Sequence, residues 1–207
     1  IGACPDDIFF TSGGTESDNW VLESAAESAT ESDSAHIIVS AIEHPAVINK
    51  CIQLKKRGCD VDYIKTDKNG IINTDDLISK IRDDTKLISV MLVNNEIGTI
   101  QPVKSVCNIA AEYAIPVHTD AVAAYGHIPV NVKELGVDYL SVSAHKIGGA
   151  KGTGFLYAKA ANINPYIYGG GQEKGKRSGT ENVAGIMGLA KAAEIAQEKL
   201  DLSLIHI

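Results

Sequence analysis

The chain has 207 residues, of which 44% are hydrophobic and 22% charged, and this composition is typical of a globular domain. A net charge of −7 without any basic run argues against nucleic acid or an anionic membrane surface as the main partner, and no apolar stretch is long enough for a membrane span. The four cysteines form no Cys-x-x-Cys pair, and the first residues lack the regions of a signal peptide. We therefore expect a cytoplasmic protein with reduced cysteines and no metal site.

Strand and helix patterns alternate along the chain. Strands are expected over residues 8–11, 36–41, 61–64, 87–93, 116–119, 139–143 and 154–158. Helices are expected over residues 15–28, 45–57, 74–81, 103–113, 132–135 and 182–199, with an exposed Ser/Thr/Glu-rich loop over 30–34. This alternation predicts one α/β domain over residues 1–200, built on a mostly parallel mixed sheet flanked by helices. Both ends of the chain look truncated, and residues 201–207 break the preceding helical pattern as a non-native tail could.

The first polar motif lies between the first strand and the first helix. The turn over residues 11–17 contains Gly14 and Thr15. Free N–H groups at a helix start favour an anion, and the Thr15 hydroxyl adds a donor. No Gly-Lys-Ser/Thr follows, so the turn is not a P-loop. The sequence predicts either a phosphate site or a plain capped turn.

The next two motifs also follow expected strands. His44 precedes the helix-starting Pro45 and can stack on an aromatic ring, transfer protons or simply cap the helix. Asn94 and Asn95 close the most apolar strand, where their amides need partners from a ligand or from a local turn.

An acid ends the strand expected over residues 116–119. Asp120 at this position needs a cationic or hydrogen-bonding partner if it is buried, and a protonated pyridine nitrogen is such a partner. A metal pair with His118 and the capping of a turn are the alternatives, although no third ligand lies at a suitable spacing.

A hydroxyl, an imidazole and an amine follow the strand expected over residues 139–143. Ser143, His145 and Lys146 stand just before a glycine-rich loop. A lysine with a lowered pKa can form a Schiff base with an aldehyde, including that of pyridoxal phosphate, whereas the alternative is a solvated surface lysine.

A second glycine-rich segment spans residues 169–182. In it, Arg177 can make a bidentate contact with a carboxylate or phosphate, and Thr180 precedes a helix start that offers another anion site. A flexible surface loop is the alternative. Taken together, the motifs fit one ligand, a phosphorylated pyridine aldehyde.

These motifs resemble those of the cysteine desulfurases of the NifS/IscS type, which are class V aminotransferase-like enzymes of pyridoxal-phosphate fold type I. The resemblance covers residues 8–199, nearly the whole chain. It is carried by Thr11-Ser-Gly-Gly-Thr-Glu-Ser-Asp-Asn19, Glu43-His44, Asn94-Asn-Glu-Ile-Gly98, His118-Thr-Asp-Ala-Val122, Ser143-Ala-His-Lys146, Gly169-Gly-Gly-Gln-Glu173 and Arg177-Ser-Gly-Thr-Glu-Asn182. It implies the large cofactor-binding domain, a homodimer, pyridoxal 5'-phosphate (PLP) as cofactor, L-cysteine as substrate, and a sulfur-acceptor or scaffold protein in iron–sulfur cluster or thio-cofactor assembly.

The resemblance also implies residue roles. Lys146 would form the Schiff base with the cofactor, Asp120 would pair with the pyridine nitrogen, and His44 would stack on the ring. Asn95 would approach the phenolic oxygen or the substrate. The phosphate would be held by Gly14, Thr15, Ser143 and His145, and by Thr180 of the neighbouring subunit.

Two departures from the family pattern bear on activity. Ala123 stands where the family usually has a glutamine three residues after the aspartate. None of the four cysteines lies in the Ser-rich context of the family's nucleophilic loop, and the N-terminal segment and C-terminal small domain are absent. We therefore expect a fragment that is inactive alone. A selenocysteine lyase, another class V aminotransferase and a non-catalytic scaffold of the same fold remain alternatives.

Overall fold

The computed structural model describes residues 1–28 and 34–200. Nearly all of the loop expected over residues 30–34, and the tail expected over 201–207, lie outside the described residues.

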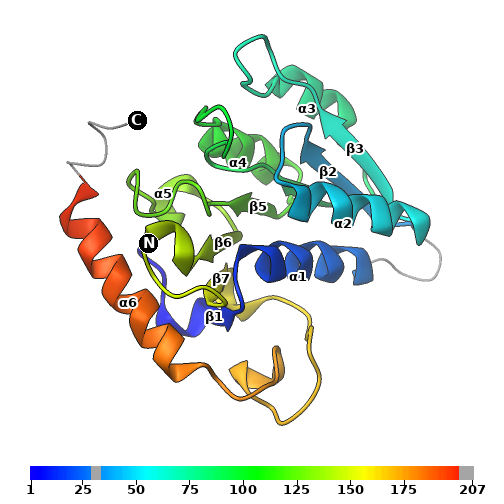
Figure 1. Cartoon of the computed structure of the whole chain (residues 1–207). Coiled ribbons are helices and arrows are strands. Elements are labelled where there is room, and N and C mark those ends of the chain that lie inside the picture. Colours follow the sequence, from blue (N-terminus) through cyan, green and yellow to red (C-terminus); the bar gives the residue numbers. More distant parts are fainter. Residues whose placement is uncertain (29–33, 201–207) are drawn as a thin grey trace.

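A single twisted sheet of seven strands forms the centre of the molecule (Figure 1). The strands are β1 (Ile8–Thr11), β2 (His36–Ser40), β3 (Asp60–Ile64), β4 (Thr85–Ser89), β5 (Val117–Asp120), β6 (Tyr139–Ser143) and β7 (Gly154–Ala158). Their spatial order is β1-β7-β6-β5-β4-β2-β3. Only β7 runs antiparallel to its two neighbours, and the other pairs are parallel. The prediction of a mostly parallel mixed sheet is confirmed.

Helices cover both faces of this sheet (Figure 1). They are α1 (Gly14–Glu27), α2 (Pro45–Lys56), α3 (Thr74–Lys80), α4 (Val103–Glu112), α5 (Val132–Leu135) and α6 (Val183–Glu198). Trp20 of α1 and Leu54 of α2 belong to one buried cluster, whereas Val106 of α4 and Leu189 of α6 belong to another. Two apolar layers on opposite sheet faces are typical of parallel sheets.

The strand expected over residues 87–93 differs most from the structure. It begins at Thr85 and ends at Ser89, although the chain stays extended further. The amides of Val90 and Leu92 still donate to the carbonyls of His118 and Asp120 over 3.0 and 2.9 Å. The apolar run therefore marks buried extended chain, and its last residues leave the ladder to form a turn at the sheet edge.

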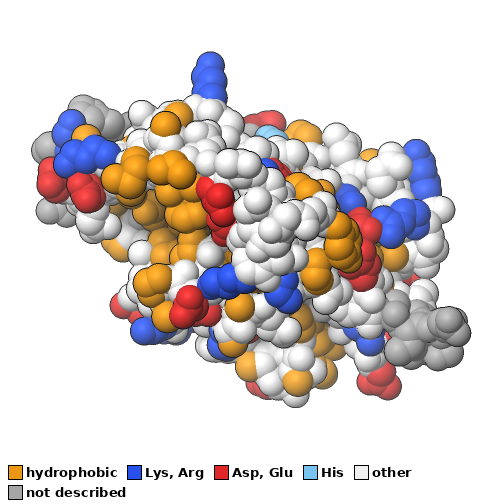
Figure 2. Space-filling view, turned by 90° about the horizontal axis from the view of Figure 1, so that it is seen from below, with side chains coloured by type: hydrophobic (Ala, Val, Ile, Leu, Met, Phe, Trp, Pro, Cys, Tyr) orange, Lys and Arg blue, Asp and Glu red, His pale blue; other side chains and the backbone are white. Residues whose placement is uncertain are grey.

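Hydrophobic side chains gather on the side of the molecule where α6 lies (Figure 2). Val183 and Met187 of this helix are each 65% exposed. Within residues 1–28 and 34–200, no helix combines the length and hydrophobicity that crossing a membrane requires.

Candidate active site

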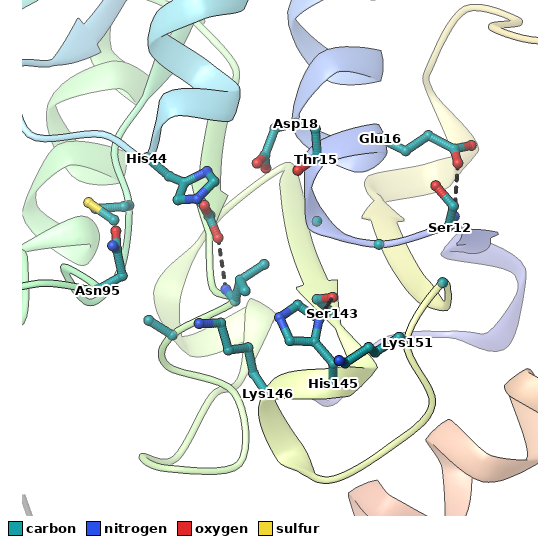
Figure 3. Close-up of a pocket in the computed structure, with 17 residues that line it drawn as sticks. Ser12, Thr15, Glu16, Asp18, His44, Asn95, Ser143, His145, Lys146 and Lys151 are labelled. Carbon is teal, nitrogen blue, oxygen red and sulfur yellow. Dashed lines mark hydrogen bonds between the residues drawn. The ribbon is translucent and has the colours of Figure 1, made fainter.

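The polar motifs meet at one edge of the sheet. The ends of β1 and β6 both pair with the first residue of the antiparallel β7, Gly154. The ends of β2, β4 and β5 lie along the same edge because these strands are parallel to β6. A cavity of about 470 Å³ opens there, a size suited to a small organic ligand (Figure 3). It is lined by Ser12, Gly13, Gly14, Thr15, Glu16, Asp18, His44, Met91, Asn95, Asp120, Val122, Ala123, Ser143, His145, Lys146, Lys151 and Gly152.

One end of the cavity is built for an anion. The N-terminus of α1 opens into it, and the N-cap residue Gly13 has no side chain that could occupy the free N–H groups. A Cβ on Gly14 would lie 2.4 Å from Val122 Cγ2, so only glycine permits this close packing. Thr15 and Ser143 add hydroxyl groups, and the Ser143 Oγ lies 2.8 Å from His145 Nδ1.

The other end carries Lys146, His44 and Asn95, whose side chains point into the same space in Figure 3. Lys146 lies in a short 3-10 turn (Ala144–Ile147) that ends at Gly148, where φ is 82°. The turn redirects the chain immediately after β6 and so brings the amine over the strand ends. Lys146 is exposed to solvent through the open cavity rather than buried.

His44 caps a helix and also lines the cavity. Its Nδ1 accepts the Ala46 N–H over 3.1 Å at the start of α2. Nδ1 is therefore unprotonated, and a neutral ring carries its proton on Nε2. The capping role expected as an alternative to a site role is confirmed, and the same bond fixes the ring at the cavity wall.

The two asparagines have different roles. Asn94 is buried, and its Oδ1 accepts the amides of Glu96 and Ile97 while its Nδ2 donates to the Ile42 carbonyl. Asn94 therefore forms the local turn and ties two strand-end loops together. Asn95, which that turn presents, lines the cavity.

Asp120 forms the floor of the cavity and is only 4% exposed. Its Oδ1 accepts the Val122 N–H over 2.8 Å. Burial raises the pKa of Asp120, while this hydrogen bond and the electrostatic effects of His44 and Lys146 oppose the rise. His118, expected as a possible metal ligand beside Asp120, instead contacts Ser89 Oγ and Ser141 Oγ through its two ring nitrogens, over 2.8 and 3.0 Å.

Arg177 and Thr180 lie outside this cavity. The predicted bidentate contact of Arg177 is confirmed, but the carboxylate belongs to the protein: Arg177 Nε and one terminal nitrogen donate to Glu16 over 2.6 and 3.1 Å. Thr180 lines a smaller adjoining depression together with Arg177. Within this chain, the structure does not bring Thr180 to the other site residues.

Sequence reasoning missed several residues of the site. Asp18 is a buried carboxyl that lines the cavity, Glu43 is a buried carboxyl bonded to the amide of the lining residue Met91, and Lys151 lies on the wall near His145. Asp18 is four residues after Gly14 in α1, so helical spacing already placed it on the helix face at the cavity. Glu43 belongs to the Glu43-His44 motif, but no local signal indicated that its side chain is buried, because this burial arises from the packing of the loop around it.

No cysteine of the described chain lines the cavity. Cys51 and Cys107 are buried, Cys4 is exposed and Cys59 is partly buried. In residues 1–28 and 34–200, no group of three or more His, Cys, Asp or Glu side chains is placed to hold a metal ion.

Comparisons with known proteins agree with this geometry. A family model described as aminotransferase class-V matches residues 1–206. A cysteine desulfurase IscS of Dictyoglomus turgidum is 53% identical over 202 residues, which is 97% of this chain and 51% of that protein. The IscS of Methanosarcina thermophila is 50% identical over 98% of this chain and 50% of its own length. The chain thus spans about half the length of the curated relatives it matches.

Solved structures share the fold. A NifS-like protein superposes with a TM-score of 0.92 at 46% identity and covers 96% of this chain and 55% of its own. A structure described as SspA in complex with cysteine gives a TM-score of 0.89 at 41% identity, over 93% of this chain and 56% of that one.

Proposed function

Because the chain belongs to the class-V aminotransferase family, we propose that it holds PLP in the strand-end cavity and that the complete protein is a cysteine desulfurase. The observation that carries this proposal is the convergence of Lys146 and Asp120, from the ends of two neighbouring strands, on one cavity. An amine and a buried acid that line one small cavity match the two ends of a pyridine aldehyde.

The chemistry that PLP supplies when bound is an electron sink beside the substrate's α-carbon. Lys146 would provide the amine that ties the aldehyde to the protein, and the same amine could accept or return a proton. Asp120 would pair with the ring nitrogen and keep it protonated. His44, fixed by its bond to Ala46, offers a flat ring for stacking and an Nε2–H for hydrogen bonding.

The anion end of the cavity fits the cofactor phosphate. Amides at the start of α1, the Thr15 and Ser143 hydroxyls and the His145 ring are the groups that would hold it. Ala123 contributes only a methyl group to the wall, so the phenolic oxygen depends on Asn95 or water for a donor. Thr180 would reach the phosphate only across the dimer that we propose for the complete protein.

The substrate we propose is L-cysteine, whose sulfur would pass to a protein thiol and leave alanine. Since none of the chain's cysteines lines the cavity, that thiol belongs to the part of the protein beyond this chain. The complete protein would then deliver the sulfur to an acceptor or scaffold protein. We expect the chain alone to bind PLP without releasing sulfide from cysteine.

Absorbance spectroscopy of the purified chain with added PLP tests the cofactor site. We expect a Schiff-base band near the visible edge. Borohydride reduction should remove this band and attach the cofactor covalently to the peptide that contains Lys146. Lys146→Ala should abolish the band, whereas Lys104→Ala, on the exposed face of α4, should leave it unchanged. A folded wild-type chain without the band, or a band that survives Lys146→Ala, would refute the site.

Cysteine turnover by the complete protein tests the reaction. Purified full-length enzyme should form alanine and protein-bound sulfur in equal amounts, and Lys146→Ala should form neither. Alanine release from selenocysteine but not from cysteine would instead identify a selenocysteine lyase. Sedimentation of the same sample establishes whether the protein is a dimer.

A further inference from the structure

A buried polar cluster forms part of the cavity floor, where Asp18 and Asp120 line the cavity and His118 contacts Asp18. Asp18 of α1 is 1% exposed, His118 of β5 is fully buried, and Asp120 is 4% exposed. His118 and Asp120 are two residues apart on one strand, so their side chains leave the same face of the sheet. Asp18 reaches this face from α1, and its Oδ1 lies 3.6 Å from His118 Nε2. Two carboxyl groups thus share one buried region.

His118 does not supply a positive charge to this region. Its ring nitrogens are occupied by Ser89 and Ser141, and the 3.6 Å separation from Asp18 exceeds a hydrogen bond. Burial lowers the pKa of His118 to about 3, so its ring is neutral near pH 7. His118 therefore offers Asp18 no positive charge that would compensate for a buried anion.

The two carboxyl groups have unequal surroundings. Asp120 accepts a backbone N–H from Val122, and His44 and Lys146 at the cavity favour its ionised form. Asp18 Oδ1 has no hydrogen-bond partner within the described part of the chain. Two buried like charges repel strongly, so such a pair retains a proton. The unequal partners decide which carboxyl keeps it.

We propose that Asp18 is a positioning residue that carries the one proton of the Asp18–Asp120 pair, so that Asp120 stays the anion facing the cavity. An ionised Asp18 would add a second negative charge near Asp120 and favour protonation of Asp120, which could then no longer pair with a cationic ring nitrogen. The role of Asp18 toward a ligand rests on the proposed PLP site. The location of the proton is a property of the chain alone.

The other titratable groups that face the pair come from three elements. Glu43 and His44 approach from the segment between β2 and α2, Lys146 from the turn after β6, and His118 from β5. Burial raises the pKa of Asp18 well above its ordinary value, and repulsion from Asp120 and Glu43 adds to this effect. A hydrogen bond with the Ser141 hydroxyl opposes the rise without outweighing it. Glu43 is itself largely protonated near neutral pH, so an experiment must distinguish it from Asp18.

Infrared spectroscopy of the ligand-free chain, with ¹³C in the aspartate carboxyl groups, separates these acids. A protonated carboxylic acid gives a carbonyl stretching band that a carboxylate lacks, and the label shifts this band for aspartate only. At neutral pH we expect one shifted band in the wild type. It should disappear in Asp18→Asn and persist in Asp120→Asn. Glu43→Gln is the matched control and should remove only an unshifted band.

The absence of a shifted band in the wild type, or its loss in Asp120→Asn, would overturn the proposal. Near-UV circular dichroism verifies that each variant is folded. If Asp18→Asn does not fold, the Asp120→Asn variant still tests the proposal. Its label-shifted carbonyl band persists only if Asp18 carries the proton.

An absorbance titration of the PLP-loaded chain tests the positioning role. Asp18→Asn should match the wild type at neutral pH, where both side chains are neutral, and should lack the alkaline transition at which Asp18 ionises. Identical alkaline titrations of the two proteins would refute that role. The two proposals can fail separately. If the infrared bands appear as expected but the chain does not bind PLP, the proposed function is refuted and the protonation of Asp18 is still supported.

Discussion

Replacing Glu43 by glutamine should stabilise the folded chain at alkaline pH. Glu43 is 7% exposed, and its Oε1 accepts the Met91 N–H over 2.7 Å and the Ser40 hydroxyl. Its Oε2 has no hydrogen-bond partner among the residues that the structure describes. Burial raises the pKa of Glu43 from 4.5 to about 8. Glutamine keeps the size and the acceptor oxygen without a group that ionises.

The sign follows from proton binding. The folded chain holds the Glu43 proton up to about pH 8, whereas the unfolded chain releases it near 4.5. The contribution of Glu43 to the free energy of unfolding is therefore fully present below pH 4.5, and it is lost as the pH rises toward about 8. At about 1.4 kcal/mol per pKa unit, the wild type should lose about 3 to 4 kcal/mol between roughly pH 5 and pH 8, and Glu43→Gln should not share this loss.

Urea unfolding of both proteins near pH 5 and near pH 8 measures this difference in the free energy of unfolding. Glu23→Gln serves as a control of opposite sign. Burial opposes ionisation of Glu23, but hydrogen bonds from Lys50 and Arg57 outweigh it and lower its pKa. Its contribution is nearly constant above the unfolded pKa of 4.5 and is lost only as the pH falls further. If the free energy of unfolding of Glu43→Gln differed from that of the wild type by the same amount at both pH values, the raised pKa of Glu43 would be contradicted.

Three further predictions use other contacts. Gly14→Ala places a Cβ 2.4 Å from Val122 Cγ2, so it should destabilise the fold by about 1 to 3 kcal/mol and weaken PLP binding, as thermal unfolding and absorbance titration would reveal. Ellman's reagent should label the exposed Cys4 in the native chain and Cys51 only on unfolding, because Cys51 is fully buried and burial raises its pKa to about 12; rapid native labelling of Cys51 would contradict this. Arg177→Ala breaks a partly buried ion pair with Glu16, so it should lower the free energy of unfolding by about 1 kcal/mol and speed proteolysis of the loop over residues 169–181. An unchanged cleavage rate would show that this ion pair does not hold the loop.

Much of the site could be predicted from local sequence because parallel strands bring their polar ends to one edge. Lys146 follows an apolar run by a few residues, and Asp120 ends another. Once both segments are strands of one parallel sheet, their final residues must be neighbours. The same logic placed His44 and Asn95 at the cavity. The position of each of these residues just after an expected strand was enough to place it at that edge of the sheet, without knowledge of side-chain packing.

The partners of charged side chains were less predictable. Arg177 was expected at an anion, but whether that anion would be a ligand or Glu16 depended on how the loop folds back over α1. Thr180 likewise follows a glycine-rich loop, and only the path of that loop places it outside the cavity. Contacts between residues so far apart in the chain leave no local periodicity.

The amino-acid sequence by itself determined the alternation of strands and helices, the mixed sheet, and the strand-end positions of Lys146 and Asp120, because these follow from short-range hydrophobic periodicity and turn chemistry. Tertiary structure alone decided which carboxyl groups are buried together. Asp18 and Asp120 are more than a hundred residues apart, and only the packing of α1 on the sheet excludes water from both. The burial of these carboxyl groups depends on contacts between segments that are far apart in the sequence. The charge at the cavity floor depends on that burial.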